Sequence, residues 1–387
     1  MNRPSAKGWC PSTLIPMKSG DGLLIRIKPP FSRLTSRQAQ KIAILSEHYG
    51  NGFLDITNRA NLQIRGLSQN TYPLMLKGLQ DIGISGNNEV PDGINLVLCP
   101  FIPYQSVGWR CAKMLYDAAS DFPSLPAKFG FAIDCGKNRY LSHISADIRI
   151  EKDTYNKLII RFDGCEKGYV TSEKTFISDI LEALNWFSSS QNKELPYQRM
   201  HQLLMNIDVP NIYAKTKPQE NKKSLNPGFE ENRQVISIPF GQLKANQLIQ
   251  LADNSQEIIF SINRCLIVDK IPNLSEEFIK TKNDLRYNVT ACTGMPGCAS
   301  ASINTKRLAL KLSESELIQF DKSYHLSGCK KGCALQIKSD ICIVGENGSY
   351  NLLENGFAWD EPIHASLSEV ALFNKLVQLK KIRKNAL

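Results

Sequence analysis

The sequence predicts an α+β protein built from two similar halves, and three observations lead to this fold class. Two long segments resemble each other, each is followed by a shorter match, and a polar stretch separates the two copies. At 387 residues the chain also exceeds what one hydrophobic core usually supports, so several domains are expected. Its 42% hydrophobic and 22% charged residues are ordinary for a globular protein.

The long repeat pairs residues 22–67 with residues 234–271. Each copy opens with alternating β-branched residues, which are typical of a strand. A turn with proline, a stretch with helical spacing and further strand-like residues follow. The strand-like residues surround an Asn-Arg pair in both copies, Asn58–Arg59 and Asn263–Arg264. Strand–helix–strand–strand units of this size predict two ferredoxin-like half-domains.

The shorter match pairs NLVLC, Asn95–Cys99, with NVTAC, Asn288–Cys292. Each string places Asn four residues before Cys at the expected end of a strand. Because the two strings follow the long repeat in the same order, internal duplication explains them better than chance. We therefore expect a larger mixed α/β domain after each ferredoxin-like half-domain, with the two halves related by a pseudo-two-fold axis. Residues 176–187 have helical spacing, and their Trp186 is expected in the core.

A polar stretch between the copies, KTKPQENKKSLNPG over residues 215–228, has the composition of an interdomain linker. The expected domain limits follow from it and from the repeat: an N-terminal segment with the first ferredoxin-like half-domain over 1–85, the first larger α/β domain over 86–214, a linker over 215–232, the second ferredoxin-like half-domain over 233–283, and the second larger domain, with the clustered cysteines, over 284–387.

Charge and hydropathy narrow the class of ligand. The 47 Lys and Arg outnumber the 37 Asp and Glu, which favours an anionic ligand or surface. We find no nucleic-acid motif, and the basic KKIRKN run near the C-terminus is expected to be a solvated tail. The N-terminal residues lack the apolar stretch of a secretory signal, and no apolar run is long enough to span a bilayer. The sequence therefore predicts a soluble cytoplasmic protein without nucleic-acid or membrane partners.

Eleven cysteines form the most informative pattern, since clustered thiols in a reducing compartment usually bind metal or do redox chemistry. Seven are scattered and are interpreted as small buried hydrophobes: Cys10, Cys99, Cys111, Cys135, Cys165, Cys265 and Cys342. The other four, Cys292, Cys298, Cys329 and Cys333, follow the spacing C-x5-C…C-x3-C. Four thiolates are what a [4Fe–4S] cluster requires. Structural zinc, which usually has C-x2-C to C-x4-C spacing, is the alternative, and two disulfides are less favoured.

Local composition supports the cluster interpretation. The glycines and the proline between Cys292 and Cys298 disfavour a helix, so this loop can wrap around a bulky group. Cys329 and Cys333 lie four residues apart, and we expect them on one face of a helix whose positive N-terminus follows Gly328.

This cysteine pattern after a duplicated unit resembles the sulfite and nitrite reductase superfamily over nearly the whole chain. The resemblance implies that Cys333 lies between the cluster and a sirohaem iron. The string TNRANLQIRG, residues 57–66, resembles the tetrapyrrole-facing Thr-Asn-Arg-Gln motif of that superfamily, although Ala60 stands in the place of Gln. Arg26 matches an arginine that faces the substrate anion.

Within the superfamily, four strings resemble the precorrin-3B synthase family: residues 8–27, 125–134, 145–150 and 238–243. This resemblance implies a monooxygenase of cobalamin biosynthesis that hydroxylates the tetrapyrrole precorrin-3A and forms a lactone. The implied co-substrates are O2 and a reduced nicotinamide, which acts through an unidentified electron donor. The implied cofactors are a [4Fe–4S] cluster and a mononuclear non-haem iron. His143 is either a ligand of that iron or a structural histidine, and no catalytic residue is identified.

Two departures from the superfamily pattern favour this function. Ile94 stands where the reductases have Arg, and of their Lys-x-Lys pair only Lys128 remains, with Gly130 in the second place. Losing two cations should disable the reduction of a small anion. A sirohaem-dependent sulfite or nitrite reductase remains the second hypothesis, and a zinc- or cluster-bearing binding module without redox turnover is the third.

The polycarboxylate tetrapyrrole needs fixed cations and hydrogen-bond donors, and arginine suits carboxylates because its guanidinium is fork-shaped. The resemblance and the repeat together predict these tetrapyrrole-binding residues: Arg26, Thr57, Asn58, Arg59, Lys128 and Arg264.

Overall fold

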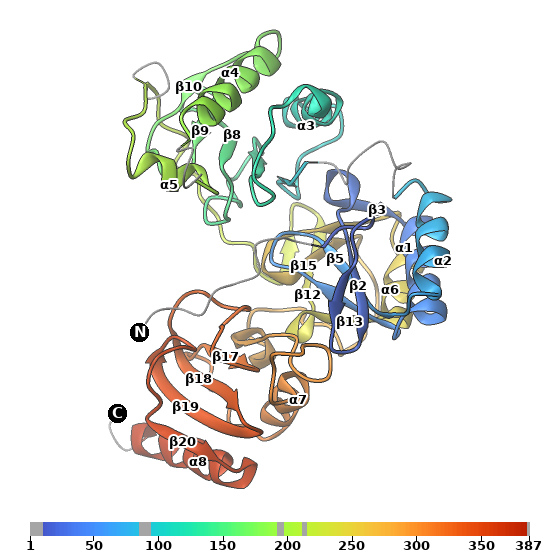
Figure 1. The fold of residues 1–387 in the computed structure, drawn as a ribbon, viewed down its shortest axis with the longest axis vertical. Coiled ribbons are helices and arrows are strands. Elements are labelled where there is room, and N and C mark those ends of the chain that lie inside the picture. Colours follow the sequence, from blue (N-terminus) through green and yellow to red (C-terminus); the bar gives the residue numbers. More distant parts are fainter. Residues whose placement is uncertain (1–10, 85–93, 192–196, 211–214, 385–387) are drawn as a thin grey trace.

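A computed structural model of the chain describes residues 11–84, 94–191, 197–210 and 215–384. These residues form four five-stranded sheets with helices packed against them, which confirms the predicted α+β class. Two of the sheets form a central ferredoxin-like region. The other two belong to the two larger α/β units, one of which lies above this centre and one below it in the view of Figure 1. None of the described helices is long and apolar enough to cross a membrane.

The two ferredoxin-like sheets exchange one strand each. The first sheet has the order β1 (Met17–Ser19), β2 (Gly22–Ile27), β5 (Leu62–Leu67), β4 (Phe53–Ile56) and β13 (Gln242–Lys244). The second has the order β11 (Gly228–Glu230), β12 (Arg233–Ser237), β15 (Cys265–Val268), β14 (Glu257–Phe260) and β3 (Arg33–Thr35). Thus β13 of the second copy pairs antiparallel with β4, and β3 of the first copy pairs antiparallel with β14. This reciprocal exchange joins the two half-domains into one core.

The helices of the two copies begin in the same way. The helices of this centre are α1 (Ser36–Tyr49), α2 (Thr71–Gln80) and α6 (Ala245–Asp253), and α1 packs against α6. The N–H of Thr35 donates to Gln38 Oε1 over 3.0 Å, and that of Lys244 donates to Gln247 Oε1 over 2.8 Å. The repeated glutamines therefore satisfy backbone groups at the two helix starts.

The two larger units share one topology. The first sheet has the order β10 (Tyr169–Val170), β9 (Leu158–Phe162), β8 (Ile148–Lys152), β7 (Phe131–Asp134) and β6 (Leu96–Leu98). The second has the order β16 (Val289–Ala291), β17 (Tyr324–Ser327), β18 (Ser339–Glu346), β19 (Ser349–Gly356) and β20 (His364–Leu367). In each sheet, the first three strands along the chain are parallel to one another. Each of the last two strands pairs antiparallel with the strand before it. The internal duplication therefore covers both kinds of unit.

The helices and short 3-10 turns complete the element list. The first larger unit has α3 (Val107–Asp117), α4 (Phe176–Ser189) and α5 (Met200–Leu204), and the second has α7 (Thr305–Glu314) and α8 (Glu369–Lys384). The 3-10 turns are Pro30–Ser32, Ala119–Asp121, Pro239–Gly241, Ile262–Arg264 and Leu285–Asn288. The predicted helix over 176–187 is α4, and its Trp186 stacks on Phe162 with ring centroids 5.3 Å apart.

The repeated asparagines have one structural role. Asn95 Nδ2 donates to the carbonyls of Ala127 and Phe129, over 3.0 and 2.8 Å. Asn288 Nδ2 donates to Gln319 O and Phe320 O, over 3.2 and 2.8 Å. In both units the asparagine thus fixes the segment that leads into the neighbouring parallel strand.

The polar stretch between the halves runs along the first larger unit. Single β-bridges join Thr216 to Gly168, Pro218 to Asp153 and Lys222 to Arg139. The strand β11 then begins at Gly228. The domain limits given above remain a prediction.

Candidate functional site

The four clustered cysteines lie at the carboxyl edge of the second larger sheet. Cys292 directly follows β16, and Cys329 comes two residues after the parallel strand β17. Burial raises the pKa of the Cys333 thiol, and the charges of Cys329, Cys292 and Cys298 raise it further. Since only nearby thiolates have this effect, the four side chains share one region of the structure.

The two cysteine loops pack directly against each other. The N–H of Ser302 donates to Gly328 O over 2.9 Å, and the N–H of Gly328 donates to Cys292 Sγ over 3.1 Å. A Cβ at position 328 would lie 2.5 Å from Cβ of Ala301, so this contact requires glycine. The N–H that points at Cys292 is the kind of donor that tunes a cluster held by thiolates.

The helix predicted over Cys329–Cys333 is wrong. Turns and bends connect β17 to the next strand, and Gly332 has a φ of +58°, which a right-handed helix excludes. Cys333 is exposed, whereas Cys329 is half-buried. The turn still places both residues near Cys292, so the grouping of thiols does not depend on a helix.

A cluster of cations lies next to Cys292. Arg264 Nη2 donates to Ala291 O over 3.4 Å, and Lys306 Nζ donates to Phe240 O. Burial lowers the pKa of Lys306 to about 8, although Asp55 and the Cys292 thiolate favour its charged form. Charged groups in such a desolvated place need anionic partners, because burying an unpaired charge is costly.

The donor set therefore fits an anionic cluster. Four thiols, one N–H aimed at sulfur and neighbouring cations are what a thiolate-bound iron–sulfur group requires. Within the described ranges, no group of three or more His, Cys, Asp or Glu side chains closes around a point to hold a single metal ion. The assignment of the four cysteines as cluster ligands remains a prediction.

Arg65 links the first cysteine loop to the N-terminal hairpin. Its side chain is 4% exposed and forms ion pairs with Asp21 over 3.0 Å and with Asp55 over 3.8 Å. The same guanidinium donates to Ser19 Oγ over 2.6 Å and to the carbonyl of Gly297, next to Cys298. Arg65 was not predicted as a site residue, although it lies in the string that resembles the tetrapyrrole-facing motif.

The turn over residues 57–61 lies between the two larger units. Thr57 Oγ1 accepts hydrogen bonds from the N–H of Arg59 and that of Asn61, over 3.3 and 3.1 Å, and so shapes the turn. Asn58 Nδ2 reaches Ala334 O over 3.5 Å, next to Cys333. The guanidinium of Arg59 points the other way and donates to Ser145 O over 3.2 Å.

Position 130 is close to Arg59. A Cβ at Gly130 would lie 2.7 Å from Arg59 Nη2 and 2.9 Å from Asn95 O. A side chain at position 130 would therefore require the flexible end of Arg59 and the backbone of Asn95 to shift. The departure from the Lys-x-Lys pattern therefore has a steric counterpart in the structure.

The remaining predicted residues are distributed around this turn. Arg264 and Asn58 line one cavity of about 200 Å³ together with Ala334. Lys128 is half-buried in the turn before β7. Arg26 lies on β2, and its Nε is buried without a hydrogen-bond partner in the described part of the chain. The structure thus brings Asn58 and Arg264 together, while Arg59 faces the first larger unit.

Two histidines differ sharply in setting. His143 is exposed in a turn before β8. His325 on β17 is 1% exposed, and its Nε2 has no hydrogen-bond partner among the described residues. Burial, with a smaller contribution from Arg264, lowers the pKa of His325 to about 4. Nothing in the sequence distinguished His325, because its burial depends on strands that pair from distant positions.

Comparisons with known proteins agree with this geometry. The profile of the nitrite/sulfite reductase ferredoxin-like half domain matches residues 15–82. The chain is 27% identical to precorrin-3B synthase of Sinorhizobium sp, over 91% of this chain and 83% of the relative. It is 24% identical to the chloroplastic ferredoxin–nitrite reductase of Arabidopsis thaliana, over 83% of this chain and 67% of the relative.

A solved structure supports the fold. The NirA protein of Mycobacterium tuberculosis superposes with a TM-score of 0.65 at 17% identity, covering 90% of this chain and 77% of that one. The chain therefore has the fold of that protein, and its first ferredoxin-like copy matches the nitrite/sulfite reductase ferredoxin-like half domain. The chain resembles precorrin-3B synthase over more of its length than it resembles the plant nitrite reductase.

Proposed function

We propose that this protein is a precorrin-3B synthase, a monooxygenase that hydroxylates precorrin-3A and forms a lactone in aerobic cobalamin biosynthesis. One oxygen atom of O2 enters the substrate and the other leaves as water, with two electrons that come from a reduced nicotinamide through an electron donor. The match to precorrin-3B synthase over 91% of the chain carries the proposal. Ile94 and Gly130, which stand where the reductases have cations, add support because anion reduction uses such cations.

In this proposal Cys292, Cys298, Cys329 and Cys333 hold a [4Fe–4S] cluster, which supplies electrons singly when bound. The cations beside Cys292 offset the negative charge of that site. Arg65 holds the first cysteine loop against the N-terminal hairpin. A mononuclear non-haem iron is part of the proposal, without assigned ligands.

Thr57, Asn58 and Arg59 place the substrate between the two larger units. Arg59 and Arg264 present guanidinium groups that suit the acetate and propionate groups of a tetrapyrrole. Arg26 and Lys128 are further carboxylate partners in this proposal. A buried Nε without a partner makes Arg26 the donor that would gain most from a substrate carboxylate.

The test is a product assay with anaerobically purified protein. Precorrin-3A, O2 and a chemical reductant should yield a product heavier by one oxygen atom, measured by mass spectrometry, with the atom derived from labelled O2. The same protein should not reduce sulfite or nitrite with a reduced dye. Robust turnover of either anion, together with the absorption of bound sirohaem, would instead establish the second candidate, a sirohaem-dependent reductase.

A further inference from the structure

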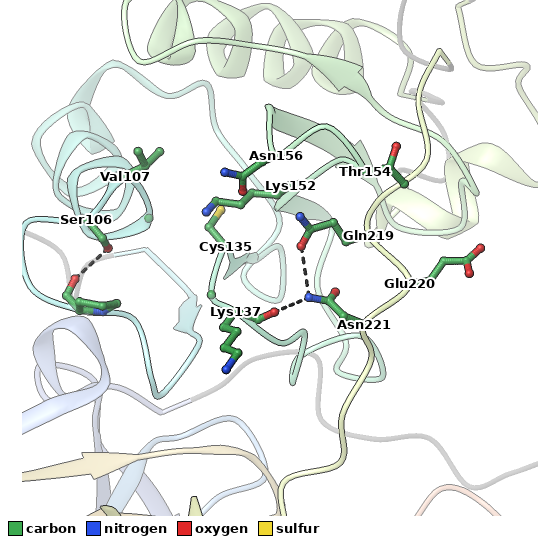
Figure 2. A pocket seen from close by; sticks show the side chains of 13 residues that line it. Ser106, Val107, Cys135, Lys137, Lys152, Thr154, Asn156, Gln219, Glu220 and Asn221 are labelled. Atoms are coloured by element: carbon green, nitrogen blue, oxygen red, sulfur yellow. Dashed lines mark hydrogen bonds between the residues drawn. The ribbon is translucent and has the colours of Figure 1, made fainter. Parts of the chain in front are cut away.

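A cavity of about 830 Å³ opens at the carboxyl edge of the first larger sheet. Its walls are the first turn of α3, the segment after β7, the end of β8 with its following turn, and residues 219–221 (Figure 2). None of its lining residues belongs to the proposed tetrapyrrole site. We propose that this cavity binds a phosphate-bearing small molecule of nucleotide size. This inference is independent of the reaction proposed above.

The position of the cavity in the sheet supports a ligand. The strands β6, β7 and β8 are parallel, and the cavity lies where the last two of them end, at Cys135 and Lys152. In open α/β sheets, ligands bind outside the carboxyl ends of parallel strands. In the second larger unit the clustered cysteines lie at this same edge. The volume is also within the usual range for small-molecule sites, about 300–1,000 Å³.

Two positive groups face each other across this cavity. The Lys152 side chain projects toward the start of α3 (Figure 2), and it forms no ion pair within the described part of the chain. The helix begins at Val107, and Ser106 Oγ accepts from the N–H of Trp109 over 3.4 Å. The N–H groups of Val107 and Gly108 thus lie at the positive end of the helix dipole. An anion between the ammonium and these N–H groups would relieve their repulsion.

Close packing presents this helix start to the cavity. A Cβ at Gly108 would lie 2.8 Å from Ile102 Cδ1 and 3.2 Å from Cys135 Cβ. Glycine therefore lets the first turn of α3 approach the end of β7, beside Lys152. The lining contains two lysines, Lys137 and Lys152, and one acid, Glu220, so its charge favours an anion.

The opposite wall supplies neutral hydrogen-bonding groups. Asn221 Nδ2 donates to Gln219 Oε1 over 3.2 Å and to Lys137 O (Figure 2). Asn221 Oδ1 is buried and has no hydrogen-bond partner among the described residues. Asn156 and Thr154 add amide and hydroxyl groups. A ligand that carries both a phosphate and hydroxyl or amino donors, as a nucleotide does, would match the two walls.

Isothermal titration of the purified holoprotein with ADP, inorganic pyrophosphate and citrate tests the proposal. ADP and pyrophosphate should each bind at one site, and ADP should bind more tightly because it also reaches the amide wall. Lys152→Gln should weaken ADP binding at least tenfold, and Asn156→Ala should weaken it severalfold. Lys157→Gln removes an exposed lysine from the same turn, outside the lining, and should leave the affinity unchanged.

Three results would overturn the proposal. The first is the absence of ADP binding at millimolar concentration. The second is an ADP affinity of both Lys152→Gln and Asn156→Ala that equals that of the wild type. The third is citrate binding that is tighter than ADP binding. The cluster absorption and the melting temperature of each variant verify that it is folded, and Asn156→Ala keeps the test decisive if Lys152→Gln fails to fold.

Discussion

The two larger units have the same strand order and the same asparagine anchor, but only the second carries the clustered cysteines. The segment between the first strand and the following helix covers residues 99–106 in the first unit. In the second unit it covers residues 292–304, which is long enough to include Cys298. The N–H of Cys99 donates to Ile133 O over 2.8 Å, and that of Cys292 donates to Leu326 O over 3.0 Å, so the two cysteines are structural counterparts.

The counterparts differ in their surroundings. Cys99 is 1% exposed, and burial raises the pKa of its thiol well above the usual value. Cys292 is half-buried, and its sulfur accepts an N–H from the second cysteine loop. Gly136 stands at the position that Cys329 occupies in the other unit. The difference teaches that the duplicated sheet supplies the scaffold, whereas the loops at its carboxyl edge decide the chemistry.

The largest expected difference between the units is in iron content. Cys292→Ala removes one of the four proposed thiolate ligands and leaves an iron without its protein ligand, so iron and sulfide should fall well below about four of each per chain. Cys99→Ala changes the counterpart cysteine and should keep the full cluster. Anaerobic iron and sulfide analysis measures both. Stoichiometric zinc without inorganic sulfide in the unmodified protein would contradict the cluster.

The next largest effect is on the stability of the protein. It concerns the longer loop over residues 292–304, which carries Cys298 and has only a shorter counterpart in the first unit. Arg65→Ala removes the buried guanidinium that pairs with Asp21 and Asp55 and holds Gly297 O. Breaking such a buried pair costs about 3–5 kcal/mol, and we expect that loss in the free energy of unfolding. Urea unfolding measures it, with Arg37→Ala on the exposed surface of α1 as the control. Equal stability of the two variants would show that the hairpin does not hold the loop.

The third prediction is a pH effect that comes from His325 in the second unit. His325 has a folded pKa of about 4 against 6.5 for the free side chain, and the first unit has Ala132 at the matching register. Between these values the unfolded chain binds a proton that the folded chain does not, so stability falls as the pH drops from about 6.5 to 4. This histidine accounts for at most about 3 kcal/mol of that loss.

Denaturant unfolding of the wild type and of His325→Leu, at several pH values between 7 and 4, measures this contribution. The variant should lose less stability on acidification, because no buried imidazole remains to be protonated. The exposed His48→Gln serves as the control and should behave as the wild type does. Identical pH dependence in all three proteins would exclude His325 as the source.

The smallest effect tests the turn between the units. Arg59→Ala should weaken tetrapyrrole binding roughly ten- to a hundredfold, because a partly buried charged hydrogen bond contributes about 1.5–3 kcal/mol. Arg59→Lys should recover only part of the loss, since an ammonium cannot replace a fork. Binding titrations, with the cluster spectrum as the control for folding, measure both. Unchanged affinity in the alanine variants of Arg26, Arg59, Lys128 and Arg264 would place the ligand elsewhere.

Much of the fold was predictable because its signals are local. The alternation and helical spacing of residues 22–67 and 234–271 predicted both ferredoxin-like copies, and the structure confirms them. The Asn-x3-Cys strings predicted the duplicated larger units, since each string ends a parallel strand. The grouping of four cysteines was also predictable, because the spacing C-x5-C…C-x3-C is rare.

The candidate site was less predictable wherever long-range packing decides it. The helix expected for Cys329–Cys333 fails because the loop must turn at Gly332, which a spacing of four residues does not reveal. Arg65 and His325 were missed because their partners come from distant strands and loops. The cavity beside Lys152 was not foreseen, because residues 219–221 reach it from the segment predicted as a linker.

The sequence by itself determined the local elements, the duplication and the set of thiols, because periodicity, capping residues and spacing act over a few neighbours. Only the tertiary structure decided the exchange of β3 and β13 between the half-domains, since any free strand edge could have accepted either one. It also decided that Arg59 occupies the space beside Gly130. Such choices depend on which distant surfaces meet, and packing energies between them, not local propensities, select the answer.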